Sequence, residues 1–146
     1  HKVLLALSDS VTARMRADGA KAYRVAVSIR SNDFKTRSHQ RKLMDATDIS
    51  KEVYQLCKHL FAELWDGHTP LRLLGVALTD LTKDDSLQMS LFPDEKKERS
   101  RKLDKAYDAI NKKFGAATIQ RGSNLQSDLK VAKKYQAQME QKKKFE

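Results

Sequence analysis

The sequence predicts an α+β fold in which two helices pack on one face of an antiparallel sheet, followed by a C-terminal helical extension. Apolar residues recur at helical spacing in residues 3–18 and 49–64, which predicts two amphipathic helices. Apolar and polar residues alternate in residues 23–30 and 71–81, which predicts two half-buried strands. The order helix, strand, strand, helix, strand is typical of a single sheet with its helices on one side.

The first helix and the first strand follow from these two periodicities. The apolar stripe of the helix is Leu4, Leu7, Val11 and Met15, and Gly19 directly follows the helix. Glycine often ends a helix because it adopts the left-handed conformation at little cost. Side chains of the strand alternate between two faces, so we expect Val25, Val27 and Ile29 to face the core. The outward set is then Arg24, Ala26, Ser28 and Arg30.

A turn at residues 31–33 leads into a second, largely polar strand over residues 34–43. The second helix follows, with either Asp48 or Ser50 as its N-cap and with Asp66-Gly67 at its end. In the third strand, Leu74, Val76 and Leu78 are expected to face the helices. The outward set of this strand is Leu73, Gly75, Ala77 and Thr79.

The chain divides into four parts on this interpretation. Residues 1–81 form the main domain, and residues 82–93 form a polar, acidic linker around a short apolar island. Residues 94–123 hold a third helix, over residues 94–114, and an extended segment. The apolar face expected for this helix is Leu103, Ala106, Tyr107, Ile110 and Phe114. Residues 124–146 are a basic, helix-prone tail that we expect to be weakly anchored.

The distribution of charge predicts a polyanionic partner. The formal net charge is +10, and residues 14–42 carry nine lysines and arginines against two acids. Residues 43–92 reverse this balance, with four basic residues against eight acids. A basic block on a strand pair is favoured as a phosphate-binding surface, because each neutralised phosphate releases condensed counterions. A merely solvated basic face is the alternative.

Neither catalytic nor metal-binding groups are predicted in this chain. Cys57 is the only cysteine and lies on an apolar helix face, as a small core residue does. The four histidines have no metal-ligand spacing, and the Asp84-Asp85 pair lies in the linker rather than at a rigid strand end. No apolar run approaches the roughly 20 residues that span a bilayer. We therefore expect a binding protein of the reducing cytoplasm, with neither a membrane nor a small-molecule substrate as partner.

The apolar island in the linker has the form of a docking peptide. Gln88 is followed by Met89, and after one more residue by Leu91 and Phe92, with Pro93 next. The glutamine amide can form hydrogen bonds while the apolar side chains fill a partner's pocket. Packing of Leu91 and Phe92 on the third helix of the same chain is an equal alternative when the peptide is considered alone.

Several segments together resemble the C-terminal region of Y-family DNA polymerases of the polymerase IV (DinB-like) type. They are Ser28–Thr36, Arg72–Leu81, Gln88–Phe92 and Lys102–Gly115, within a resemblance that covers residues 3–123. The resemblance implies a little-finger domain, which in that family grips template-primer DNA across the major groove. That domain has a strand before its first helix, whereas this chain begins at or inside the helix, so we expect three of its usual four strands. Catalytic carboxylates and their Mg²⁺ lie in other domains of the family, so no cofactor is implied here.

The resemblance also assigns candidate binding residues. The family's peptide for the β sliding clamp matches Gln88, Met89, Leu91 and Phe92, with methionine where leucine is usual. Related polymerases can carry arginine at the positions of Leu73 and Ala77. Because this chain has no arginine there, we expect the DNA contacts to come from the backbone around Gly75 and from the basic residues between positions 24 and 41. We expect Arg24, Ser28, Arg30, Lys35, Arg37 and Arg41 to lie along DNA phosphates on the outward face of the sheet. The full set of expected DNA-binding residues is Arg24, Ser28, Arg30, Lys35, Thr36, Arg37, Ser38, Arg41 and Gly75.

The sequence thus predicts a sequence-independent DNA-binding module of a translesion DNA polymerase, with DNA and the β sliding clamp as partners. The nucleotidyl transfer itself would belong to other parts of that polymerase. Three alternatives remain open from the sequence: a clamp-associated repair protein that is not a polymerase, a small nuclease, and a small nucleic-acid-binding protein that prefers RNA.

Overall fold

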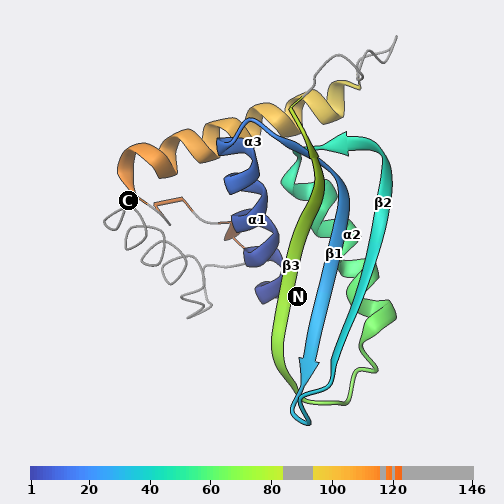
Figure 1. Cartoon of the computed structure of the whole chain (residues 1–146). Coiled ribbons are helices and arrows are strands. Elements are labelled where there is room, and N and C mark those ends of the chain that lie inside the picture. The colour runs from blue at the N-terminus through green and yellow to red at the C-terminus, as the bar shows by residue number, and fades with distance from the viewer. Residues whose placement is uncertain (84–93, 116–117, 120, 123–146) are drawn as a thin grey trace, which may run out of the picture.

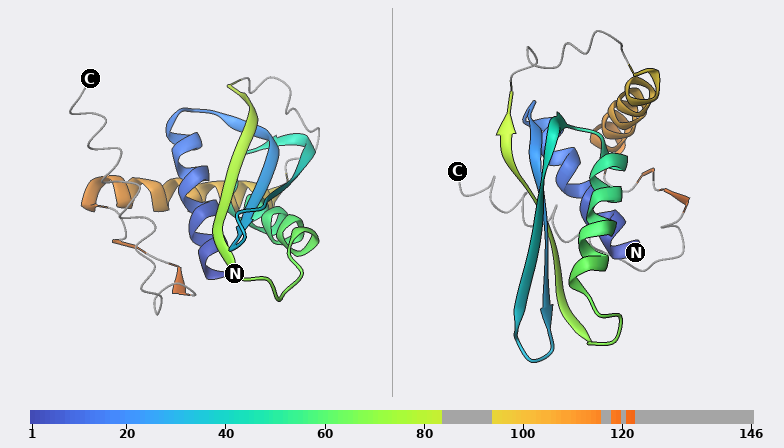
Figure 2. Two further views of the ribbon diagram at one scale, coloured as in Figure 1. Left: turned by 60° about the horizontal axis from the view of Figure 1, so that its bottom comes forward. Right: turned by 90° about the vertical axis from the view of Figure 1, so that its right-hand side faces the viewer.

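A computed structural model describes residues 1–83, 94–115, 118–119 and 121–122. Three strands, β1 (Lys21–Ser31), β2 (Thr36–Thr47) and β3 (Leu71–Thr82), form an antiparallel sheet in the order β2-β1-β3. Helices α1 (Lys2–Ala17) and α2 (Ser50–Leu64) cover one face of this sheet, and no helix of the described residues covers its other face (Figures 1 and 2). Helix α3 (Glu95–Phe114) crosses one end of the two-helix layer. The predicted α+β fold is therefore confirmed.

The core lies between the helix pair and the sheet. Its fully buried residues are Leu4, Val25, Val27, Val53, Cys57 and Leu60. The predicted inward residues of β3 pack against this cluster. Burial raises the pKa of the Cys57 thiol to about 11, so this cysteine is a protonated core residue at neutral pH, as the sequence predicts.

The buried face of α1 differs from the predicted stripe. Ser8 and Thr12 are fully buried, whereas Leu7 and Val11 are only half-buried. The Ser8 hydroxyl donates to the carbonyl of Leu4 at 2.8 Å, and the Thr12 hydroxyl donates to the carbonyl of Ser8 at 2.6 Å. These bonds satisfy both hydroxyls inside the helix, which lets small polar residues occupy an apolar interface.

The start of α2 is not capped by Asp48 or Ser50 as predicted. Ile49 is its N-cap residue, with no side-chain cap. The Asp48 carboxylate instead accepts from Arg101 of α3 at 2.9 Å, and the Ser50 hydroxyl accepts from Arg16 of α1 at 2.9 Å. The Ser50 backbone amide donates to the carboxylate of Asp104, also on α3, at 2.8 Å. A side chain from a distant helix thus takes the place of a local cap.

Helix α3 is attached by charged side chains that we call the ionic clasp: Arg16, Asp48, Arg101, Asp104 and Asp108. Arg16 makes a bidentate contact to Asp108, with nitrogen–oxygen distances of 2.7 and 3.0 Å, and also donates to the Asp48 carbonyl at 2.8 Å. Burial disfavours the charge on Arg16, but hydrogen bonding to Asp108 and the attraction of the Asp108, Asp104 and Asp48 carboxylates together outweigh it, so the net pKa of Arg16 is raised. The guanidinium therefore stays charged where α1, α2 and α3 meet.

Most of the apolar face predicted for α3 is exposed. Leu103 and Phe114 are each 65% exposed and Ala106 is exposed, whereas Tyr107 and Ile110 are half-buried and Asp104 is the only buried residue of the helix. Asp94 caps the helix by accepting from the amides of Lys96 and Lys97, and Lys112 and Lys113 lie in its last turn. The ends of α3 thus follow the predicted dipole-compatible pattern. Its orientation is set by the ionic clasp instead.

Candidate nucleic-acid interface

The face of the sheet opposite the helices is the candidate interface. Directly paired residues on neighbouring strands point to the same face, so the register identifies its members. Arg24 lies between Lys42 and Thr79, Ser28 between Ser38 and Gly75, and Arg30 between Thr36 and Leu73. The predicted faces of β1 and β3 are confirmed by burial, since Val25, Val27 and Ile29 are buried and the outward residues are not.

Two arginines lie at opposite ends of this outward face. The Nε of Arg30 donates to the Thr36 hydroxyl at 2.9 Å, and this exposed guanidinium has no carboxylate partner among the described residues. Arg24 forms a salt bridge with Asp80 of β3 at 3.0 Å, and both side chains are partly exposed. Arg30 is therefore available to an anionic ligand, whereas Arg24 must first exchange or share its contact with Asp80.

Between the arginines, most side chains of the outward face are small. Ala26, Ser28 and Ser38 line it together with Gly75 and Ala77, and the longer side chain of Gln40 stands beside Ala26. A Cβ atom added at Gly75 would lie 2.7 Å from the hydroxyl oxygen of Ser28, so a side chain there would displace the serine. A surface of this kind lets a flat or extended polyanion approach the backbone closely.

Two of the expected binding residues lie on the opposite face. The prediction that Arg37 and Arg41 point outward is wrong, because they pair with the inward residues Ile29 and Val25. Arg41 forms a salt bridge at 3.0 Å with Glu63 of α2, and His39 contacts the same carboxylate at 3.0 Å. β2 is almost entirely polar, so its sequence carries no alternation from which its faces could be read.

Lys35 lies in the turn between β1 and β2 rather than on the sheet. Its ammonium forms a salt bridge with Asp33 at 3.1 Å. A hydrogen bond from the Ser31 hydroxyl, aided by Lys35, lowers the pKa of Asp33 to about 2. Thr36 and Ser38 do lie on the outward face, each paired with an outward residue of β1.

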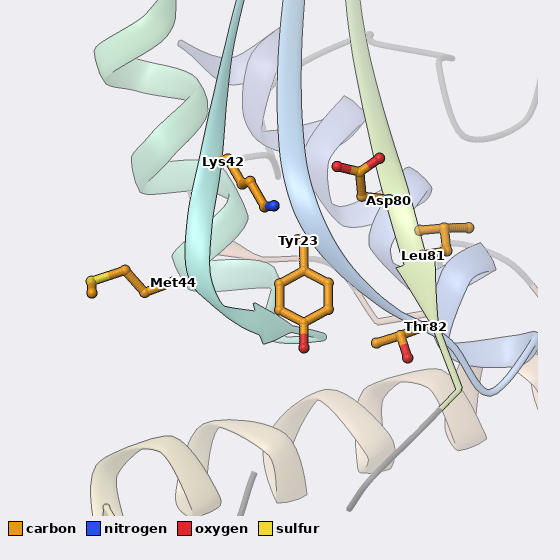
Figure 3. A pocket seen from close by; sticks show the side chains of 6 residues that line it. All are labelled: Tyr23, Lys42, Met44, Asp80, Leu81 and Thr82. Atoms are coloured by element: carbon orange, nitrogen blue, oxygen red, sulfur yellow. The ribbon is translucent and has the colours of Figure 1, made fainter. Parts of the chain in front are cut away.

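Lys42 joins the outward face, and the sequence reasoning did not include it. The pairing of β1 with β2 is interrupted by a bulge next to Lys42. Arg24 pairs with Lys42 and Ala22 pairs with Thr47, so the single residue Tyr23 of β1 lies opposite residues 43–46 of β2. This bulge lies beside a shallow pocket of about 400 Å³. Figure 3 shows Lys42, Tyr23 and Asp80 lining this pocket from three strands, with Met44 pointing away. Lys42 follows Ser38 and Gln40 at every second position, but only the register with β1 shows which face these residues share.

A further exposed contact lies at the other end of the sheet. Phe34, in the turn after β1, has a φ of 64° and is 63% exposed. The Arg72 guanidinium of β3 lies 4.6 Å from its ring centroid, a cation–π distance. Sequence reasoning assigned no role to either residue.

The remaining predicted site residues, Gln88, Met89, Leu91 and Phe92, lie outside the described residues. Within the described ranges, no three histidine, cysteine, aspartate or glutamate side chains are grouped so that they could hold a metal ion. The same part of the chain contains no helix with the length and apolarity needed to cross a bilayer.

Residues 1–91 match the family described as the impB/mucB/samB family C-terminal domain. The chain is 35% identical over 130 residues to DNA polymerase IV of Clostridium acetobutylicum, which covers 89% of this chain and 33% of that protein. It is 39% identical over 126 residues to DNA polymerase IV 2 of Bacillus subtilis, covering 84% of this chain and 30% of the relative. DNA polymerase IV of Bacillus anthracis is 32% identical over 142 residues, 96% of this chain and 34% of the relative. The chain thus spans about a third of these relatives, and the likeness extends past residue 91 into α3.

Proposed function

Because the chain belongs to the impB/mucB/samB family, as its C-terminal domain, we propose that it is a sequence-independent DNA-binding module of a translesion DNA polymerase. The observation that carries the proposal is the open face of the sheet. It is lined mostly by small side chains and bears Arg30 and Lys42 at opposite ends. Such a surface contacts phosphates without reading base edges, so it holds DNA whatever its sequence or damage.

The nucleotidyl transfer of such a polymerase belongs to the remaining two thirds of the length seen in the relatives. Carboxylates that bind Mg²⁺ are expected there and not in this module. The chemistry of the module is then limited to holding the template-primer duplex and to recruiting the polymerase to its site of action.

The two faces of the sheet provide the experiment. We compare Arg30→Ala, on the outward face, with Arg41→Ala, on the helix side. Both variants lose one arginine from an exposed strand position, so their net charges match. If the outward face binds DNA, Arg30→Ala raises the Kd for duplex DNA several-fold and lowers the dependence of log Kd on log salt concentration by about 1, whereas Arg41→Ala changes neither. Equal effects of the two variants would refute binding by the outward face.

The second part of the proposal concerns recruitment. Gln88, Met89, Leu91 and Phe92 are proposed to bind the β sliding clamp, with the glutamine amide and the two terminal apolar side chains in separate pockets. Replacing both Leu91 and Phe92 by alanine should abolish clamp binding and leave DNA binding unchanged. The matched control replaces Leu103 and Phe114, an exposed leucine and phenylalanine of α3, by alanine. Clamp binding that survives the first double substitution contradicts this assignment.

A further inference from the structure

From residue 99 to residue 113, the outward side of α3 carries charge of a single sign, whereas its first turn carries the exposed acids Glu95 and Glu98. Between residues 99 and 113 its exposed charged residues are Arg99, Lys102, Lys105, Lys112 and Lys113. The acids in the same interval are Asp104 and Asp108, and both face Arg16 in the ionic clasp. Both carboxylates of residues 99–113 are therefore paired within the ionic clasp, whereas the five exposed cations of the same residues lie on the surface.

These cations form a stripe that runs along the helix. Arg99, Lys102 and Lys105 follow each other at three-residue spacing, and Lys112 lies two turns beyond Lys105, so they share one side. The interval from residue 99 to 113 covers roughly 21 Å at 1.5 Å per residue. None of the five side chains forms a salt bridge with a carboxylate of the described residues. The clasp docks α3 by its other side, so this basic stripe faces away from α1 and α2.

We propose that the basic stripe of α3 (Arg99, Lys102, Lys105, Lys112 and Lys113) is a second DNA-binding surface that contacts phosphates of duplex DNA. A run of cations without interspersed acids complements a uniformly negative polymer better than a protein surface of mixed charge. The five members of the stripe are cations, so they offer contacts to the phosphate backbone. The exposed ring of Phe114 lies beside the stripe at the end of α3, with its centroid 5.3 Å from the Lys113 ammonium. This inference rests on the proposed DNA-binding function and extends it to a different part of the molecule.

The position of α3 separates this surface from the first one. The two helices α1 and α2 cover one face of the sheet, and α3 lies on their side, across one end (Figure 2). The outward face of the sheet and the basic stripe therefore contact different phosphates. The proposed role of the stripe is to lengthen the grip on DNA beyond the segment that the sheet holds.

The test is a charge reversal on the stripe with a matched control. Lys102→Glu with Lys105→Glu changes the net charge by the same amount as Lys51→Glu with Lys58→Glu, two exposed lysines of α2. Binding of the 146-residue chain to fluorescent duplex DNA is measured at several salt concentrations, and circular dichroism verifies folding. The stripe variant should weaken binding at least tenfold and lower the salt dependence by about 2, because two phosphate contacts are lost. The control should show only the small effect of net charge.

A milder variant, Lys102→Gln with Lys105→Gln, removes the charges without repulsion and should show the same reduction in salt dependence. The inference is overturned if the stripe variants bind like the wild type, or if they lose no more affinity than the α2 control. Failure of the wild-type chain to bind DNA at all would instead refute the proposed function, and the inference with it.

Discussion

Helices α1 and α2 are held to the sheet by apolar burial, whereas α3 is held to α1 and α2 by ion pairs. The first interface contains side chains with essentially no exposure, such as Val53 and Leu60. The second contains Arg16, whose side chain is 10% exposed, and Asp104, whose side chain is 7% exposed. Arg121 adds to the second interface by contacting Asp9 of α1 at 3.0 Å.

The difference predicts two kinds of stability in one chain. Apolar burial stabilises the sheet and its helix pair by roughly 25 cal/mol per Å² of buried surface, with no strong dependence on salt. Partly buried ion pairs lose much of their attraction to desolvation, so α3 is expected to open without unfolding the rest. The elements proposed to bind DNA through the sheet are thus independent of the docking of α3.

The largest expected effect comes from the core. Leu60→Ala leaves a cavity in a fully buried site and should lower the free energy of unfolding of the whole domain by about 2–5 kcal/mol. Urea denaturation followed by circular dichroism measures this change. The control is Leu103→Ala, the same substitution at a residue that is 65% exposed, which should stay within about 0.5 kcal/mol of the wild type. Equal losses would contradict the distinction between the two interfaces.

A smaller and more local effect is expected from the clasp. Arg16→Met leaves Asp104 and Asp108 without their main cation, so α3 docking should weaken by about 2–3 kcal/mol. Hydrogen exchange should accelerate in the amides of α3 and much less in those of β1. Labelling of Cys57, whose thiol has a pKa of about 11, reports on the core and should remain slow.

Lys105→Met is the control for Arg16→Met, because it removes a cation from the exposed side of α3, which the ionic clasp does not use. It should leave exchange in α3 unchanged. If Arg16→Met accelerates Cys57 labelling as strongly as Leu60→Ala does, α3 is not a separable part and the comparison fails.

The smallest effect concerns pH. Burial raises the pKa of Asp9 above its ordinary value of 3.8, and the nearby Arg121 opposes that shift. Because its pKa is raised, the Asp9 carboxyl binds its proton more tightly in the folded state than in the unfolded state. Its contribution to stability is therefore complete below pH 3.8 and is lost as the pH rises through the folded-state pKa. An NMR titration of the Asp9 carboxyl should give a midpoint above 3.8, and Arg121→Ala should move the midpoint higher. A midpoint below 3.8 in the wild type would be the opposite result.

The sequence was informative wherever burial leaves a periodic pattern. The faces of β1, β3 and α2 could be predicted because apolar residues alternate or recur there. The buried face of α1 could not, since Ser8 and Thr12 hide their polarity in bonds within the helix. The docking face of α3 was equally hidden, because Asp104 resembles any solvated acid until Arg16 and Ser50 are brought to it by the fold.

The candidate site shows the same division. Arg30 could be assigned to the outward face from the alternation of its own strand, whereas β2 is polar at nearly every position. Its inward arginines and the outward Lys42 became distinguishable only through pairing with β1. The peptide from Gln88 to Phe92 remains a prediction from its residue pattern and from the family resemblance.

The central claim, that this chain holds DNA through phosphates and not through bases, is tested most directly by a salt titration on two duplexes of equal length and unrelated sequence. We expect the same Kd for both at every salt concentration, and a steep linear loss of affinity as log salt rises, with a slope of about −0.9 per phosphate contacted. An affinity that stays constant between low and physiological salt, or that differs strongly between the two sequences, would contradict the account.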